Sequence, residues 1–549
     1  MSSSVAQPLF ILALSWLCWR LLRPHLFRKS NGIHNLPGPD DASWVTGHLS
    51  KMMNTTAWDY HRKVLRQFGA ISHIKGVFGA DEIYTFDPKA LHHILIKDHS
   101  IVWDETDSLI AGLKTMFGEG ITTTLGERHR RQRKMFNPVF SINHMREMVP
   151  IFYEVAHKVE KAFLKKVENG PQELDVMDWM TRLALELIGQ TGLGYSFDEL
   201  TETSKPHRYA QASKQLVPTQ SENTVVLQTL LPYLTRIGTK RFRRWIVDHI
   251  PSEDIKRLRD IIDVLHETSV EIYQSKLAAI KQGDEALAAQ IGRGKDIISI
   301  LLKANMKVED DGKLSEEELL GQVTSLTFAA PDTTSGALAR TFHLLAQHKD
   351  AQAKVREELR NARKATGGED IDYDTLVALP YLDALCRETL RLYPPVPMVN
   401  RVARQDAILP LLTPAKGKDG STVTEVEVPK GTIAHLSILN SNTNPALWGP
   451  DAGEWKPERW LNPLPQELVD ARIPGVYSHL LTFMGGGRSC IGFKFSQLEM
   501  KVVLALMLEK FEFSLSDKNI YWQMTGIATP NLDTTSTMPT LPLIVSKAK

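Results

Sequence analysis

The segment "FMGGGRSCIG", residues 483–492, places Cys490 directly after three glycines and an arginine and a serine. Cys490 is one of only three cysteines in the 549-residue chain, which argues against a disulfide framework and against zinc or iron–sulfur sites that need several clustered thiolates. Any metal ion bound here would have a single thiolate ligand. The glycines permit a tight turn, which brings backbone N–H groups to the sulfur and leaves room for a flat cofactor. A buried structural cysteine beside a glycine turn is the alternative.

The residues around Cys490 favour a negatively charged sulfur. The stretch "FKFSQLEMKVVLALMLEKFEF", which begins at Phe493, predicts an amphipathic helix. The positive end of that helix's dipole would stabilise a thiolate at Cys490. Arg488, two residues before the cysteine, could pair with a carboxylate of the cofactor.

Five residues of this segment have the spacing of a known motif. Phe483, Gly486, Arg488, Cys490 and Gly492 resemble the Phe-x-x-Gly-x-Arg-x-Cys-x-Gly haem loop of the cytochrome P450 family, the haem-thiolate monooxygenases. The resemblance implies a haem b cofactor, with Cys490 as the axial iron ligand and with Phe483, Arg488 and Gly492 in contact with the haem. It also implies that the other motifs of the family precede this loop in order.

A charged cluster of the family is present upstream. Glu388 and Arg391 in "RETLR" can pair on one face of a helix, and they match the family's Glu-x-x-Arg helix. Arg459 in "WKPERW" has the position of the third member. By resemblance these residues form a buried structural triad that serves folding and haem retention rather than chemistry. Taken alone, the pair is equally typical of a solvated helix.

Contacts to the haem propionates are predicted at three further positions. The stretch "GERHRRQRKMFNPVF" has His129 and Arg133 where the family often has Trp-x-x-x-Arg. A histidine can still donate a hydrogen bond to a carboxylate, so we expect the role to survive the substitution. Arg401 in "VNRVAR" has the position of another propionate contact.

The stretch "TFAAPDTTS", residues 327–335, resembles the oxygen-activating helix of the family. Cleavage of O₂ consumes two protons, and Asp332 with Thr333 forms the acid–alcohol pair that manages them. Two residues depart from the family pattern: Ala330 replaces a glycine, and Pro331 lies where the helix interior should be. We expect a continuous helix that Pro331 kinks. The alternative is a helix that begins here, with Pro331 in its first turn.

The rest of the chain predicts one large, helix-rich domain. Apolar residues at three- and four-residue spacing dominate from about residue 140 to 365, and short β-like runs such as "EIYTF" and "TEVEVPKGTIAHLSIL" lie toward both ends. The predicted fold class is therefore mainly α with a minor β-rich lobe (α+β), the helical prism of the family. With 65 basic and 64 acidic residues, nothing indicates a nucleic-acid partner.

The N-terminus predicts a membrane anchor. Residues 5–22, "VAQPLFILALSWLCWRLL", are apolar enough for a short transmembrane helix, and basic residues follow them. A cleaved signal peptide is the alternative, but the basic start and the small-residue cleavage site are missing. We therefore divide the chain into an anchor with its basic flank, residues 1–34, and a monooxygenase domain, residues 35–549. The expected location is the endoplasmic reticulum membrane, single-pass, with the catalytic domain cytosolic.

By resemblance, the chain is a monooxygenase that inserts one atom of O₂ into a lipophilic small molecule, such as a terpenoid or another secondary metabolite. No dinucleotide-binding motif is present, so electrons from NADPH would arrive through a separate cytochrome P450 reductase. Lys494 and Lys501 are candidate contacts for that reductase. One alternative is a haem-thiolate peroxide isomerase or dehydratase, which needs no reductase. A non-catalytic haem-binding protein is an alternative from another class.

Overall fold

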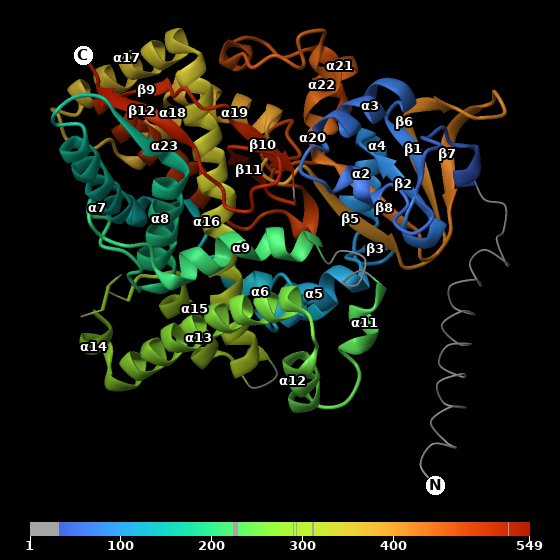
Figure 1. The fold of residues 1–549 in the computed structure, drawn as a ribbon, viewed down its shortest axis with the longest axis horizontal. Coiled ribbons are helices and arrows are strands. Elements are labelled where there is room, and N and C mark those ends of the chain that lie inside the picture. The colour runs from blue at the N-terminus through green and yellow to red at the C-terminus, as the bar shows by residue number, and fades with distance from the viewer. Residues whose placement is uncertain (1–31, 223–228, 289, 292–293, 310–311, 525) are drawn as a thin grey trace.

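The computed structural model describes residues 32–222, 229–288, 290–291, 294–309, 312–524 and 526–549. Most of these residues are helical (Figure 1). The α-helices are α2 Leu49–Met52, α3 Trp58–Phe68, α4 Pro88–His92, α5 Asp107–Phe117, α6 Gly126–Phe136, α7 Ile142–Lys166, α8 Val176–Leu187, α9 Arg208–Glu222, α11 Leu231–Leu234, α12 Lys240–His249, α13 Glu253–Gln282, α14 Asp284–Ala288, α15 Ile297–Lys307, α16 Glu316–Gln347, α17 Lys349–Ala365, α18 Tyr373–Ala378, α19 Pro380–Leu392, α20 Ile438–Thr443, α21 Pro445–Trp448, α22 Gln466–Ala471 and α23 Phe493–Lys510.

The strands form one five-stranded sheet in the order β1-β2-β8-β5-β3, one three-stranded sheet in the order β4-β12-β9, and the pairs β6-β7 and β10-β11. Their bounds are β1 Ile71–Lys75, β2 Asp81–Thr85, β3 Trp103–Asp104, β4 Gln172–Asp175, β5 Met398–Ala403, β6 Ala407–Lys416, β7 Thr422–Val428, β8 Ile433–Ser437, β9 Phe511–Leu515, β10 Tyr521–Met524, β11 Ala528–Asn531 and β12 Pro542–Lys547.

The β-like runs at the two ends of the chain meet in space. Strand β2 pairs in parallel with β8, so that Tyr84 lies beside His435. Figure 1 shows these early (blue) and late (orange) strands side by side in a lobe apart from most of the helices. The prediction of a helix-rich fold with a minor β-rich lobe is confirmed.

Helix α16 is continuous for 32 residues and contains Pro331 in its interior. The first-turn alternative for Pro331 is therefore wrong. The helix begins at a capping box, in which Ser315 and Glu318 each bond the other's backbone N–H. Most of α16 is buried, but Phe328, Ala329 and Thr333 in its middle are not.

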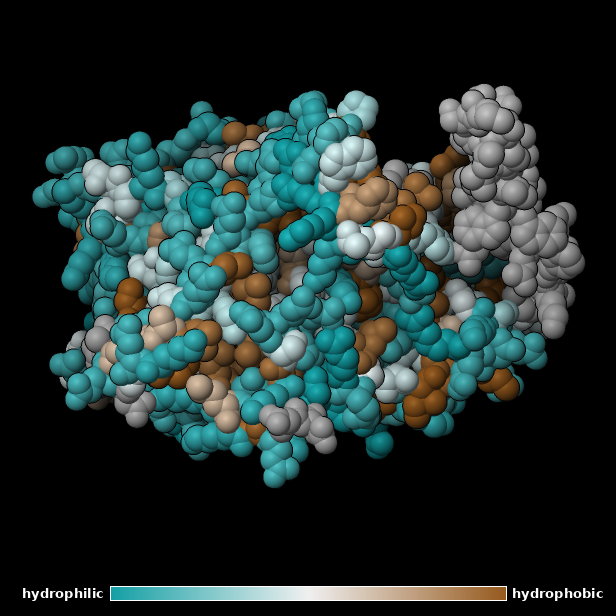
Figure 2. Space-filling model, turned by 90° about the horizontal axis from the view of Figure 1, so that it is seen from below, coloured by the Kyte–Doolittle hydropathy of each residue, from teal (hydrophilic) through white to brown (hydrophobic). Residues whose placement is uncertain are grey.

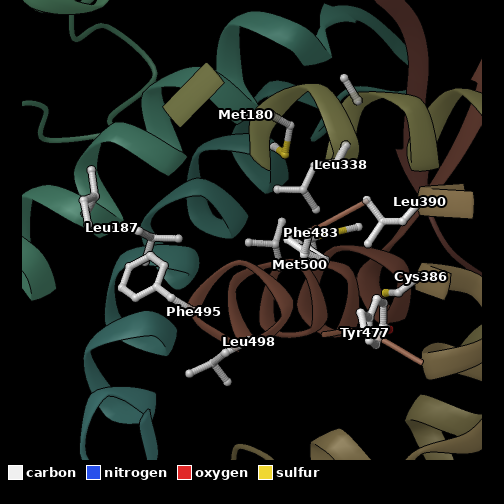
Figure 3. Close-up of a cluster of buried hydrophobic side chains, with 14 of the residues drawn as sticks. Met180, Leu187, Leu338, Cys386, Leu390, Tyr477, Phe483, Phe495, Leu498 and Met500 are labelled. Atoms are coloured by element: carbon white, nitrogen blue, oxygen red, sulfur yellow. The ribbon is translucent and has the colours of Figure 1, made fainter. Parts of the chain in front are cut away.

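Helix α23, which follows Cys490, lies in the core beside α7, α16, α17 and α19. Figure 3 shows Met500 of α23 facing side chains from the neighbouring elements, among them Met180 of α8, Leu338 of α16 and Leu390 of α19. These four residues are all buried. Apolar burial of this kind contributes about 1.5–3 kcal/mol per large side chain, which holds the cysteine loop to a rigid base.

The proline-rich segment after the predicted anchor is docked on the β-lobe. The carbonyl of Pro37 accepts a hydrogen bond from His73 N, 2.8 Å long. A Cβ atom at Gly38 would lie 1.9 Å from His73 O, so only glycine permits this approach. The predicted transmembrane segment, residues 5–22, lies outside the described residues, whereas the predicted boundary after residue 34 falls within a 3₁₀ helix, Gly32–Asn35. No helix among residues 32–549 that the structure describes is long and apolar enough to cross a bilayer.

Large apolar side chains are exposed on α11, α12 and the turn that joins them. Figure 2 views the molecule from the side on which α12 lies and shows brown residues scattered among teal ones. The exposed apolar residues of this segment are Leu230, Tyr233, Leu234, Ile237, Phe242, Trp245 and Ile246.

Candidate active site

Cys490 lies in the turn between a short 3₁₀ helix, Gly486–Arg488, and the start of α23. Its N–H donates to Phe483 O over 2.8 Å, which closes the loop. The side chain borders an open depression of about 530 Å³, yet the surrounding protein is dense enough that burial raises the pKa of the thiol. The N–H of Gly492 and the guanidinium of Arg133 act in the opposite direction and favour the thiolate. The expected backbone donor to the sulfur is therefore present.

The glycines of the loop have separate roles. Gly486 has φ +72°, and a Cβ there would lie 2.0 Å from Leu95 O. Gly485 has an extended backbone, but a Cβ would lie 1.8 Å from Pro474 O. Only Gly486 needs the left-handed conformation that we expected of the turn. Glycine is needed at position 485 because the backbone of Pro474 packs too closely for a side chain.

Arg133 is directed at the cysteine loop. Its Nη1 donates to Ser489 O over 2.7 Å and its Nη2 donates to Ser489 Oγ over 2.9 Å. His129, one turn earlier on α6, is buried. Burial, with Arg488 and Arg133 nearby, lowers the pKa of His129 to about 3, so its imidazole is a neutral donor or acceptor.

Arg401 and Arg488 approach the same region from different elements. Arg401 Nη1 donates to Glu105 Oε2 over 2.9 Å, and Arg488 donates to the carbonyls of Ile121 and Thr124. The Nε atoms of both arginines are buried and have no hydrogen-bond partner among the described residues. Buried donors normally have an acceptor, and a carboxylate forms the stronger bond with a guanidinium. The two arginines fit the two carboxylates of a haem.

His99 is a member of this cluster that the sequence analysis missed. A Cβ at Gly487 would lie 3.1 Å from His99 Nε2, and burial with Arg401 and Arg488 nearby lowers the pKa of His99. Nothing in the local sequence of His99 marks it. His99 reaches this cluster because the segment before β3 approaches the cysteine loop.

The charged triad is assembled as an ion-pair network. Glu388 accepts from Arg391 Nε and Nη2 over 2.8 and 2.7 Å, and both side chains are fully buried. Arg459 Nε lies 3.5 Å from Glu388 Oε1 and its Nη1 lies 2.8 Å from Asp451. Trp460 Nε1 also donates to Glu388. The sequence analysis missed Asp451 and Trp460.

On α16 the acid and the alcohol have different surroundings. The Thr333 hydroxyl donates to Ala329 O over 2.9 Å, on the part of the helix that is not buried. Asp332 is buried and accepts from Ser213 Oγ of α9 over 3.1 Å. Burial raises the pKa of Asp332 to about 6, although Ser213 and Lys214 oppose this shift. Asp332 can therefore gain and lose a proton near neutral pH.

The helix beside Thr333 has an apolar lining. Phe328 stacks on Phe117 of α5, with 4.4 Å between the ring centroids. Ala330 is partly exposed beside them. Aromatic and small apolar side chains at this point suit a lipophilic ligand.

One expected reductase contact is wrong. Lys501 is only 3% exposed and donates to Asp383 Oδ1 over 2.8 Å and to Val377 O over 3.0 Å. Its side chain therefore ties α23 to α18 and α19, and no partner protein can reach it. Lys494 is partly exposed and lines the same depression as Cys490.

The comparisons with known proteins agree with this geometry. The family model for cytochrome P450 matches residues 36–534. Cytochrome P450 monooxygenase 91 of Postia placenta is 50% identical over 517 residues, which cover 94% of each chain. Ganoderic acid synthetase CYP5150L8 of Ganoderma lucidum is 43% identical over 533 residues, 97% of this chain and 96% of that protein. The chain therefore belongs to the cytochrome P450 family, whose members are monooxygenases that use haem b and receive electrons through a reductase.

Proposed function

We propose that this protein inserts one oxygen atom from O₂ into a lipophilic secondary metabolite, such as a terpenoid, with electrons from NADPH delivered by a separate cytochrome P450 reductase. The observation that carries the proposal is the loop that presents Cys490, together with buried guanidinium donors that fit two carboxylates. The apolar surroundings of Phe117 and Phe328 support a lipophilic substrate. The similarity to a protein named ganoderic acid synthetase supports a natural product as the substrate class.

When bound, the haem supplies the iron at which O₂ is reduced. Cys490 would bind its iron through the thiolate, and Arg401, Arg488 and His129 would hold its carboxylates, with Arg133 supporting the loop through Ser489. Phe117 and Phe328 exclude water beside Thr333. The Thr333 hydroxyl orients a proton donor, and Asp332 holds the proton that replaces the one consumed.

Two other functions fit these observations less well. A peroxide isomerase or dehydratase would need neither Asp332 nor Thr333 in these surroundings, so the titratable, buried Asp332 argues against it. A non-catalytic haem protein is favoured only by Ala330 and Pro331. Helix α16 runs through both residues without a break, and the relatives named above as monooxygenases argue for an enzyme.

The proposed reductase surface is the depression beside Cys490, with Lys494 at its edge. Arg130 and Lys134 lie on helix α6, as Arg133 does, and both side chains are exposed. Basic side chains around a short path to the iron suit an acidic electron donor. Lys501 is buried and is not part of this surface.

We further propose that residues 1–34 anchor the protein in the endoplasmic reticulum membrane. The exposed apolar residues of α11 and α12 alternate with Arg236, Arg241 and Arg244, a pattern suited to the surface of a bilayer. Asn54, in the sequon Asn54–Thr56, gives a test. It stays unglycosylated if the domain is cytosolic, and a glycan at Asn54 would contradict the proposed orientation.

The first experiment is the difference spectrum of the purified protein, reduced under carbon monoxide. A strongly red-shifted Soret band is expected because a thiolate would bind the iron. An unshifted band, or well-folded protein without haem, would overturn the proposal. Substrate-dependent NADPH consumption with added reductase then separates a monooxygenase from an isomerase, which would turn over a lipid peroxide without reductase.

A further inference from the structure

We propose that His34, His73 and Asp81 form a zinc site that fastens residues 32–38 to the β1–β2 hairpin. His34 belongs to the 3₁₀ helix Gly32–Asn35, and His73 and Asp81 belong to strands β1 and β2, which lie in the β-lobe (Figure 1). The site shares no residue with the surroundings of Cys490, so it goes beyond the proposed function.

The two strands present a pair of ligands on one face of the sheet. Strands β1 and β2 pair antiparallel, with Lys75 opposite Asp81 and His73 opposite Ile83. Side chains two positions apart on a strand share a face, so His73 and Lys75 lie on the face of Asp81. His73 reaches Asp81 diagonally across the two strands, and its Nε2 lies 2.7 Å from Asp81 Oδ1.

His34 is held beside this pair by its own segment. Ile33 and Leu36, on either side of it, are fully buried. The carbonyl of Pro37 accepts the hydrogen bond from His73 N, which ties the segment to strand β1. A ligand whose backbone is already fixed loses little freedom when it binds, so the fold prepares His34 to complete a metal site.

The three side chains have the spacing of such a site. One ligand atom of each residue lies within 4.8 Å of the ligand atoms of the other two. His34 Nε2 lies 3.6 Å from Asp81 Oδ2, and the two imidazole rings stand at 88° to each other. Ligand atoms about 2.0–2.2 Å from a tetrahedral zinc ion lie about 3.3–3.6 Å apart. Side-chain movements of about 1 Å would therefore close the site around the ion.

Two imidazoles and one carboxylate favour zinc over magnesium or calcium, which prefer sets of oxygen ligands. The side chains of His73 and Asp81 are only 7% and 14% exposed, whereas that of His34 is 29% exposed. The ion can therefore enter past His34, and a water molecule can complete its tetrahedral shell. Each neutral imidazole that binds through Nε2 keeps its proton on Nδ1.

Lys75 competes with the ion for Asp81. Its Nζ lies 2.5 Å from Asp81 Oδ1, and its side chain is 27% exposed. A zinc ion must displace this ammonium, which the flexible lysine side chain can carry into solvent. Removal of Lys75 should therefore tighten zinc binding. In an ordinary cluster of ion pairs the same removal would only lose a contact, so Lys75 distinguishes a metal site from a salt-bridge network.

The first test measures binding of zinc chloride to the purified full-length protein, after treatment with a chelator, by isothermal titration calorimetry. The wild type should bind one zinc ion per chain with a micromolar dissociation constant. His34→Gln and His73→Gln should each abolish this binding, while His266→Gln, at an exposed position of α13, should not. Lys75→Ala should lower the dissociation constant by about tenfold, because it removes the competitor and its repulsion of the ion.

The second test locates the ion by amide hydrogen exchange. Zinc should slow exchange in residues 32–38 and 71–85, because it joins the two segments in the folded state, and should leave helix α13 unchanged. The proposal is overturned if zinc fails to bind, if it binds the two histidine variants as tightly as the wild type, or if Lys75→Ala does not tighten binding. Slowed exchange only at other segments would mean an adventitious ion and would also overturn it. Neither readout needs haem or turnover, so failure of the proposed function would leave both unchanged.

Discussion

Arg133 binds both oxygens of Ser489, the residue immediately before Cys490, at 2.7 and 2.9 Å. This contact joins α6 to the cysteine loop across 356 positions of sequence. Because the guanidinium also favours a thiolate at Cys490, it holds the loop in place and stabilises the charge of the sulfur.

Arg133→Ala should lower the free energy of unfolding by about 2 kcal/mol, since hydrogen bonds from a charged donor are worth roughly 1.5–3 kcal/mol. It should also lower the fraction of protein with the red-shifted carbon monoxide band. Arg130→Ala, on the exposed face of the same helix, is the control and should change neither. Equal spectra for both variants would contradict the role of Arg133.

Glu388→Gln should destabilise the protein by about 3–5 kcal/mol, because it leaves the buried Arg391 without its counter-charge. Denaturant unfolding and the rate of haem loss would measure the effect. Glu357→Gln removes an exposed carboxylate on α17 and should cost almost nothing. If the two substitutions have similar effects, the triad does not stabilise the fold.

Thr333→Ala should lower the product formed per NADPH by about tenfold or more, since a positioned proton donor contributes roughly 10²–10⁴-fold. Hydrogen peroxide should increase in its place, while NADPH consumption continues. Thr333→Ser retains the hydroxyl and should restore most of the coupling. An unchanged product yield in Thr333→Ala would favour a reaction that needs no proton delivery.

Glu499→Met should stabilise the protein. Glu499 is fully buried in α23, and neither carboxylate oxygen has a partner among the residues described, so burial raises its pKa well above 4.5. The wild type therefore loses stability relative to the variant as pH rises above 4.5. We expect a gain of about 1–3 kcal/mol near pH 8 and a smaller gain near pH 5, measured by urea unfolding. A gain that shrinks with rising pH would contradict the assignment.

Lys494→Glu should weaken reductase-supported turnover by raising the reductase concentration at half-maximal rate, since it reverses a charge at the proposed docking surface. Added salt should reduce the difference between variant and wild type. Lys416→Glu, on an exposed strand of the β-lobe, is the control for net charge. Equal behaviour of the two variants would remove Lys494 from the docking surface.

Several parts of the site could be predicted because they depend on local spacing. The turn around Cys490 and the helix that follows it arise from neighbours in sequence, as does the pairing of Glu388 with Arg391 one helical turn away. The continuous α16 was also predictable, because apolar periodicity extends on both sides of Pro331 and outweighs one proline.

Other parts depended on contacts between distant segments. The sequence contains no sign that Lys501 is buried. Lys494 lies two helical turns earlier on the same face of α23 and is accessible, and only the packing of α18 and α19 makes the exposure of the two lysines different. The same holds for Gly485, whose need for glycine comes from Pro474 rather than from its own backbone.

The sequence by itself determined the family and the helix-rich fold and predicted the role of Cys490, because fixed spacings and periodicities are properties of short segments. The tertiary structure alone decided which groups surround those residues. Ser213 meets Asp332 across 119 positions, and Glu105 meets Arg401 across 296. Burial, charge and proton affinity depend on such neighbours, and only the folded chain brings them together.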